Sequence, residues 1–205
     1  LIKIDREIEI SEYFNLRQQI ESLREKISNI ITQPKYIINF MNPGRLIHVV
    51  NKNDDFGWCV VINFRKRPNN KMNENEPIYT IDALFNVTKE SSKSGYLSEI
   101  KPAINDIDGV MHIVPIQPSV IKEISSICIY LPQNLQTLDS RQSVLKTLKV
   151  SVKLFRNRLK IFNNIYLKET KKRTKGEYPL LDPIEDMGIK DKDLVETVKV
   201  IKYCK

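Results

Sequence analysis

The basic residues of this sequence gather in one segment, and phosphate binding is the chemistry that such a segment can perform. Residues 153–175 contain nine lysines and arginines and one acidic residue, Glu169, so this segment accounts for the whole formal net charge of +8. A local basic stripe is the usual electrostatic footprint of a polyanion partner. The alternative is a solvated helix face or loop that has no partner, and charge alone leaves both interpretations open.

Residue types that perform catalysis are present without the spacing that a reaction needs. The sequence contains neither a GxxxxGK[ST] phosphate cradle nor a GxSxG nucleophile elbow. His48 and His112 each lie inside an expected strand, where a structural role is expected. Residues 106–109 resemble part of a calcium loop, but Ile104 and Pro115 occupy the first and last ligand positions. We therefore expect a non-catalytic chain that holds no metal or cofactor.

Composition excludes further classes of protein. Six glycines in 205 residues are too few for a Gly-rich nucleotide-binding fold. The three cysteines are odd in number and lack CxxC spacing, which argues against a disulfide framework or zinc knuckle and favours a reducing compartment. Apolar runs stay far below the roughly 18 residues of a membrane span, so we expect no membrane partner.

Residues 11–41 predict a helix and the chain that leads out of it. Apolar residues recur in steps of three and four, the heptad seam of a helix that pairs with another. This seam consists of Tyr13, Leu16, Ile20, Leu23, Ile27 and Ile30. Ser11 is the expected N-cap, and Pro34 is expected to stop the helix.

Residues 42–138 predict a small β-barrel. β-branched and aromatic residues fill five short stretches, and residues 79–87 alternate strictly between apolar and polar side chains. These stretches are residues 46–50, 58–64, 79–87, 110–116 and 127–131. Five short strands in about 90 residues favour a barrel over a larger sandwich.

Residues 139–205 return to helix. A second heptad seam runs from Leu145 to Tyr166, with Asp139 and Gln142 as a capping pair at its start. Residues 178–188 predict an extended connector, after which Asp191 caps a last helix. Because neither seam has a partner within its own helix, we expect the two to pair antiparallel. The predicted fold class is therefore α+β, with a small barrel inserted at the tip of a helical stalk.

Several stretches in consistent order carry a family resemblance. They are Gln33-Pro34-Lys35-Tyr36, Asn42-Pro43-Gly44-Arg45-Leu46-Ile47, residues 54–64, Ile124-Ser125-Ser126-Ile127, Arg141-Gln142-Ser143-Val144-Leu145, and Tyr178-Pro179-Leu180-Leu181-Asp182-Pro183-Ile184. Together they resemble the arch insertion of the nuclear exosome-associated DExH RNA helicases, the helicase subunits of TRAMP-type polyadenylation complexes. The resemblance extends from about Tyr13 to Ile201.

The resemblance implies an SH3-like barrel of the KOW type on a helical stalk, with further stalk helices after Lys205. It also implies a nuclear parent protein that unwinds RNA in the 3′–5′ direction and works with the exosome in RNA processing and decay. ATP and magnesium would belong to the helicase core of that parent, which this chain lacks. The expected partners are structured RNA such as tRNA-like or pre-ribosomal RNA, adaptor proteins of the exosome, and the helicase core.

The resemblance assigns RNA contact to the end of the second strand, where the family carries basic residues. The matching residues are Arg65, Lys66 and Arg67, and Arg45 is a further candidate, with a solvent-facing structural role as its alternative. The basic segment is an insertion of about twenty residues relative to the family, over about residues 156–177. Its lysines and arginine at positions 171–173 and 175 are expected to add an auxiliary RNA site; they are Lys171, Lys172, Arg173 and Lys175.

A protein-interaction module is the alternative function, with RNA contact secondary. The expected anchors on the barrel for adaptor motifs are Phe56, Ile127, Cys128 and Tyr130, whereas Trp58 is expected in the core. The family carries an arginine where this chain has Cys128, and cysteine cannot form the bidentate pair with a carboxylate. We therefore expect weak binding of acidic adaptor motifs. A third alternative, an unrelated ribosomal or transcription barrel, does not account for the two flanking heptads.

Overall fold

A five-stranded antiparallel sheet forms the centre of the computed structural model, which describes residues 6–68, 77–103, 109–162 and 178–203. Along the sheet the strand order is β4-β3-β2-β1-β5. The strands are β1 (Arg45–Asn51), β2 (Asp54–Arg67), β3 (Ile78–Thr88), β4 (Gly109–Ile116) and β5 (Ile121–Cys128). A 3₁₀ turn, η3 (Pro118–Val120), joins β4 to β5 and so folds the two ends of the sheet toward each other.

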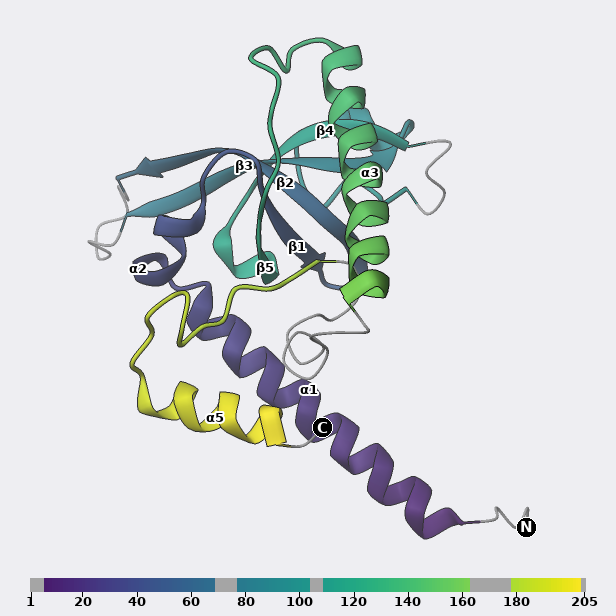
Figure 1. Cartoon of the computed structure of the whole chain (residues 1–205). Helices are drawn as coiled ribbons and strands as arrows, with labels where there is room; N and C mark the ends of the chain where they lie inside the picture. The colour runs from purple at the N-terminus through teal and green to yellow at the C-terminus, as the bar shows by residue number, and fades with distance from the viewer. Residues whose placement is uncertain (1–5, 69–76, 104–108, 163–177, 204–205) are drawn as a thin grey trace.

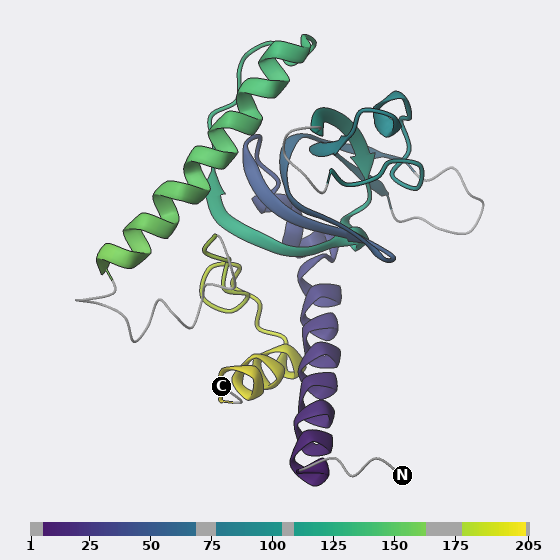
Figure 2. The ribbon, with the colours of Figure 1, turned by 90° about the vertical axis from the view of Figure 1, so that its right-hand side faces the viewer.

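The sheet carries a separate apolar cluster on each face. The inner face closes on itself around Val61, Ile81, Phe85 and Ile124, as in a small barrel. On the outer face, Leu46, Val60 and Leu84 pack under the helix α3 (Leu138–Phe162). Figure 2 shows α3 flanking this face of the sheet. The strands are therefore apolar on both faces over their central residues, and this explains their unbroken β-rich runs.

The helix α1 (Glu7–Ile31) begins earlier than the sequence predicts. Its N-cap is Arg6 in a left-handed conformation, so the expected cap at Ser11 is wrong and Ser11 lies inside the helix. Only the C-terminal end of the expected seam is covered. Tyr13 is 62% exposed and Leu16 is 51% exposed, and they lie on the part of α1 that projects away from the sheet (Figure 1).

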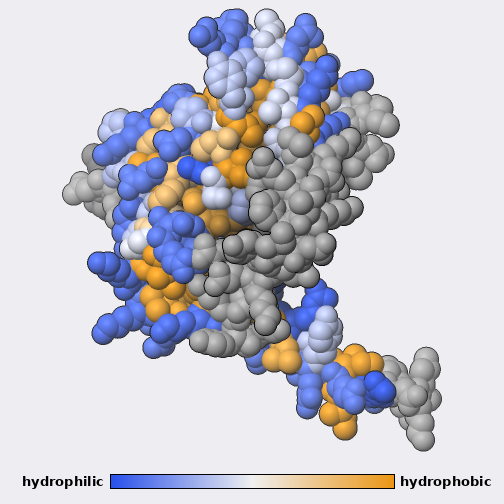
Figure 3. All heavy atoms as spheres, in the orientation of Figure 1, coloured by the Kyte–Doolittle hydropathy of each residue, from blue (hydrophilic) through white to orange (hydrophobic). Residues whose placement is uncertain are grey.

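The space-filling view shows hydrophobic side chains on this projecting part of α1 (Figure 3). At the other end of the helix, Ser28 Oγ donates a 3.0 Å hydrogen bond to the carbonyl of Ile121 at the start of β5. This bond ties the helix to the barrel. The chain then continues through α2 (Pro34–Ile37) and a 3₁₀ turn, η1 (Ile38–Phe40), into β1.

The two heptad helices do not pair with each other, which corrects the expected stalk. The apolar residues Val144, Leu145 and Leu148 of α3 pack on the outer face of the sheet. The partner of α1 is instead the last helix, α5 (Lys192–Tyr203), whose Leu194 and Val198 are buried. Figure 1 shows α5 lying beside α1. A heptad seam specifies an apolar face but not what covers it, and the wide apolar face of the sheet is the larger partner for α3.

Local capping explains where the other helices begin. Thr137 Oγ1 accepts a 3.3 Å bond from the amide of Ser140, so Thr137 caps α3 and the expected cap at Asp139 is wrong. Gln142 reaches β4 instead, where its Nε2 donates to the carbonyl of Gly109 at 3.3 Å. Asp191 caps α5 as predicted, with Oδ1 3.1 Å from the amide of Leu194.

The connector from Tyr178 onward follows the free edge of β5. The carbonyl of Pro179 accepts from the amide of Ser126 at 2.9 Å, and the amide of Leu181 donates to the carbonyl of Ile124 at 2.8 Å. Tyr178 is buried, and its hydroxyl donates to the carbonyl of Leu148 at 3.1 Å. The connector thus covers an exposed strand edge and brings α5 back to α1. Among the described helices, none is long and apolar enough to cross a membrane.

Candidate nucleic-acid interface

The expected basic residues lie at one end of the β2–β3 ribbon. Arg65, Lys66 and Arg67 pair in register with Thr80, Tyr79 and Ile78. The last pair between β3 and β4 is Ile81 with Ile116, so this end of the ribbon extends past the neighbouring strand. The sequence folds this way because β-branched and aromatic residues continue along β2 to Phe64, immediately before the basic run.

The three basic side chains of this run have different partners. Arg65 forms an ion pair through Nη2 with Asp82 Oδ1, a carboxylate whose side chain is 15% exposed. Arg65 Nε is buried and has no hydrogen-bond partner among the described residues. Lys66 and Arg67 are exposed, and no ion pair involving either is found in the described part of the chain. Two of the three predicted cations are therefore available to a phosphate, while the charge of Arg65 is balanced within the sheet.

An aromatic pair lies beside these cations. The rings of Phe64 and Tyr79 stack with centroids 5.5 Å apart and planes 17° apart. Tyr79 is the cross-strand partner of Lys66, so an aromatic ring and a free ammonium group share the end of the ribbon. Sequence reasoning identified residue 79 only as the start of an alternating strand. The signal that could have found it is the antiparallel register, which places the start of β3 opposite the basic run.

Arg45 acts inside the barrel. Its Nε donates to the carbonyl of Phe40 at 3.1 Å, and its Nη1 donates to the carbonyls of Ser125 and Ser126 at 3.2 and 2.9 Å. These bonds join the lead-in of β1 to β5. The guanidinium thus supports the structural alternative for this residue, and its contact with RNA stays a prediction.

The expected adaptor surface is only partly exposed. Phe56 is buried, with its ring at 88° to that of Phe85, so it cannot serve as a surface anchor. Ile127 packs against the outer-face cluster, and Trp58 also packs there, in a T-shaped contact with Tyr178. Cys128 is exposed rather than enclosed by its β-branched neighbours, and Tyr130 is 83% exposed. The remaining accessible anchors are therefore Cys128 and Tyr130, with Ile127 half-buried between them and the core.

Titratable groups elsewhere have structural partners. His48 Nε2 lies 2.9 Å from Asp55 Oδ1, and His112 Nε2 lies 2.8 Å from the carbonyl oxygen of Ser94, as expected for strand histidines. Burial raises the pKa of the Cys59 thiol, and the charge of Asp55 raises it further. No group of three or more His, Cys, Asp or Glu side chains in the described ranges is placed to hold a metal ion.

The expected auxiliary site falls outside the described residues. Its four basic residues are Lys171, Lys172, Arg173 and Lys175. The helix α3 carries the chain to Phe162, so at least the first part of the expected helical extension is present.

Comparison with known proteins identifies the family. A family model described as "Mtr4-like, beta-barrel domain" matches residues 33–205. The human protein named "Exosome RNA helicase MTR4" is 38% identical over 98% of this chain and 18% of its own length. The "ATP-dependent RNA helicase mtr4" of Schizosaccharomyces pombe is 29% identical over 94% of the chain and 16% of its own length. The "DExH-box ATP-dependent RNA helicase DExH10" of Arabidopsis thaliana is 28% identical over 96% of the chain and 18% of its own length.

The chain therefore spans less than a fifth of the length of these relatives. The family match covers the sheet, α3 and α5, and these are the elements that position the basic run and the connector. Together with the resemblance to helicases along nearly the whole chain, this match shows that the chain belongs to the Mtr4-like β-barrel domain family.

Proposed function

We propose that this chain is the RNA-binding, non-catalytic arch domain of an ATP-dependent 3′–5′ RNA helicase that works with the nuclear exosome. The names of the relatives supply the helicase and exosome parts of this proposal. In it, ATP and Mg²⁺ bind a helicase core outside this chain. The role of the chain is to hold structured RNA through the barrel, and TRAMP-type processing and decay in the nucleus is the setting.

One observation carries the RNA-binding part of the proposal. Lys66 and Arg67 are exposed at the projecting end of the β2–β3 ribbon and have no ion-pair partner within the described ranges. Free cations on a rigid strand end can contact phosphates without first breaking an internal ion pair. The stacked rings of Phe64 and Tyr79 fix this end of the ribbon and so reduce the ordering cost of binding.

The test is a titration of the full 205-residue chain with a tRNA-like RNA at several salt concentrations. We expect the double substitution Lys66→Ser and Arg67→Ser to weaken binding. It should also flatten the slope of log affinity against log salt by about 1.4 to 1.8, as expected for two lost phosphate contacts. The matched control, Lys89→Ser with Lys93→Ser, removes two exposed cations elsewhere on the surface. Equal losses in both variants would show that only net charge matters, and would contradict this site.

A second candidate function is the docking of short adaptor motifs. It is favoured by the exposed Cys128 and Tyr130 at the end of β5, next to the half-buried Ile127. An exposed tyrosine beside partly covered aliphatic surface is typical of peptide-binding sites. This function and RNA binding would use different ends of the sheet, so substitutions can separate them.

A further inference from the structure

A groove of about 350 Å³ lies where α1 meets the barrel. The C-terminal end of α1 contributes Asn29 and Gln33, the first residues of β3 contribute Ile78 and Tyr79, and the β4–β5 link contributes Gln117 and Ser119. Prolines at the start of α2, before β3 and in η3 complete its walls. Its volume falls within the range of about 300–1,000 Å³ in which pockets for small ligands lie.

The lining has the chemistry of a site for a neutral, flat and polar group. None of the described lining residues is charged, and about half of them are apolar, including the ring of Tyr79. The side-chain amides of Asn29, Gln33 and Gln117 make no hydrogen bond to other described residues, so their donors and acceptors are free. Amide side chains can pair with the donor and acceptor edges of a nucleobase, and aromatic rings stack on its face.

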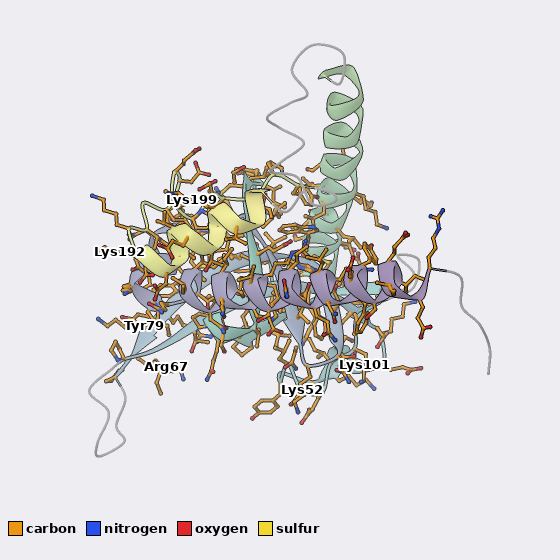
Figure 4. The ribbon with its side chains drawn as sticks, turned by 90° about the horizontal axis from the view of Figure 1, so that it is seen from below. Lys52, Arg67, Tyr79, Lys101, Lys192 and Lys199 are labelled. Carbon is orange, nitrogen blue, oxygen red and sulfur yellow. The ribbon has the colours of Figure 1, made fainter. Side chains whose placement is uncertain are left out.

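The groove adjoins the free cations of the proposed RNA site. Two of its lining residues, Ile78 and Tyr79, are the cross-strand partners of Arg67 and Lys66. Figure 4 shows Arg67 and Tyr79 at the same end of the ribbon, beside α1. Phe64 packs on the ring of Tyr79 at 17° and fixes its orientation. A phosphate held by the two cations would therefore bring its own base, or the next one, to the groove.

We propose that this groove binds an unpaired nucleobase of an RNA whose backbone lies on Lys66 and Arg67. The inference deepens the proposed function and rests on it. It assigns to the chain a preference for structured RNA that carries a single-stranded extension. Stacking and hydrogen bonding to one base are carried by the groove, whereas the phosphates are carried by the two cations.

The experiment compares three RNAs that share one hairpin, with the full 205-residue chain. One hairpin is blunt, one carries a short single-stranded tail, and one carries a tail of the same length made of abasic nucleotides. We expect the normal tail to strengthen binding over the abasic tail by about fivefold or more, the lower end for one stacked base. The abasic tail retains the phosphates, so any difference between the two tails measures base recognition alone.

Two groove variants locate the effect. The double substitution Asn29→Ala with Gln117→Ala removes exposed amides, and Tyr79→Leu removes the aromatic ring while it keeps an apolar side chain. Each should abolish most of the difference between the tails and leave binding of the blunt hairpin unchanged. The matched controls Gln133→Ala and Tyr96→Ala alter an exposed glutamine and an exposed tyrosine away from the groove, and they should retain the full difference.

The outcomes separate this inference from the proposed function. If the blunt hairpin binds but the two tails are equivalent, the groove does not read a base, and a peptide ligand becomes the alternative for it. If the tails differ but the groove variants retain the difference, the base binds elsewhere and the inference is overturned. If no RNA binds at all, both the proposed function and this inference are wrong.

Discussion

Arg45 and Cys128 lie directly opposite each other on the adjacent antiparallel strands β1 and β5. The guanidinium of Arg45 turns away to the carbonyls of Phe40, Ser125 and Ser126, while Cys128 stays exposed. A cation introduced at position 128 would therefore have a positively charged cross-strand neighbour. That arrangement favours a carboxylate ligand, because the ligand would reduce the repulsion between the two cations.

The substitution Cys128→Arg is expected to strengthen binding of a peptide that carries the acidic adaptor motif. A hydrogen bond to a charged group contributes about 1.5–3 kcal/mol, so the gain should reach about tenfold or more by calorimetry. Cys128→Lys serves as a control, because it adds the charge without the bidentate geometry and should give a smaller gain. Tight binding by the unsubstituted chain would show that another residue replaces the arginine of the family.

Arg65 is expected to contribute less to RNA binding than its two neighbours. Its ion pair with Asp82 must be weakened before it can contact a phosphate, whereas Lys66 and Arg67 have no such competitor among the described residues. We expect Arg65→Ser to lower RNA affinity less than Arg67→Ser does, as measured by fluorescence anisotropy at fixed salt. Asp82→Asn should raise the affinity, since it releases the guanidinium. A loss for Arg65→Ser that equals the loss for Arg67→Ser would contradict this ranking.

Two glycines are expected to differ in their tolerance of a side chain. Gly44 has φ of +88°, and a Cβ there would lie 2.0 Å from the carbonyl oxygen of Ile129, whereas Gly57 has φ of +65° with open space around it. We expect Gly57→Val to lower the free energy of unfolding by about 1–2 kcal/mol, the cost of a left-handed backbone. Gly44→Ala should cost more than this, because the backbone must also move.

Urea or thermal unfolding monitored by circular dichroism measures both effects. Gly95→Ala is the control, since Gly95 has neither a left-handed backbone nor a close neighbour. Equal stability of the Gly44 and Gly57 variants would show that β1 and β5 can separate at this point without cost.

The two described cysteines are expected to react at different rates with a thiol reagent. Cys128 is exposed, whereas burial raises the pKa of Cys59 and keeps its thiol protonated. In a Cys204→Ser background, one thiol should react quickly at pH 8 and the second only on unfolding. As the pH rises above the ordinary thiol pKa, the unfolded chain loses a proton that the folded chain retains. The folded state should therefore lose stability in alkaline solution, and less so in a Cys59→Ala variant.

The basic segment is expected to act through charge alone. Replacement of Lys171, Lys172, Arg173 and Lys175 by Ser should lower RNA affinity with little dependence on RNA sequence, because contacts to phosphates carry no base information. The salt slope should flatten by up to about four phosphate contacts at 0.7–0.9 each, and the melting temperature should shift by no more than about 2 °C. An unchanged affinity and slope would show that the segment has no role in RNA binding.

Local sequence patterns determined which secondary structures form. The alternation from Tyr79 to Val87 is the strand β3, the seam ending at Ile30 belongs to α1, and Asp191 caps α5. These features depend on side-chain periodicity and on hydrogen bonds between residues close in sequence, so they can be recognised without knowledge of the fold. The position of the basic run at the end of β2 follows from the same kind of pattern.

The tertiary structure alone decided which surfaces meet. The seams of α1 and α3 looked complementary, yet α3 covers the sheet and α5 covers α1, because an apolar stripe does not specify its partner. Likewise, the pairing of Arg65 with Asp82 follows from strand register. The groove brings together Asn29, Tyr79 and Gln117 from three elements far apart in the sequence. Contacts of this kind form only when the sheet closes and α1 docks against it, so no local pattern records them.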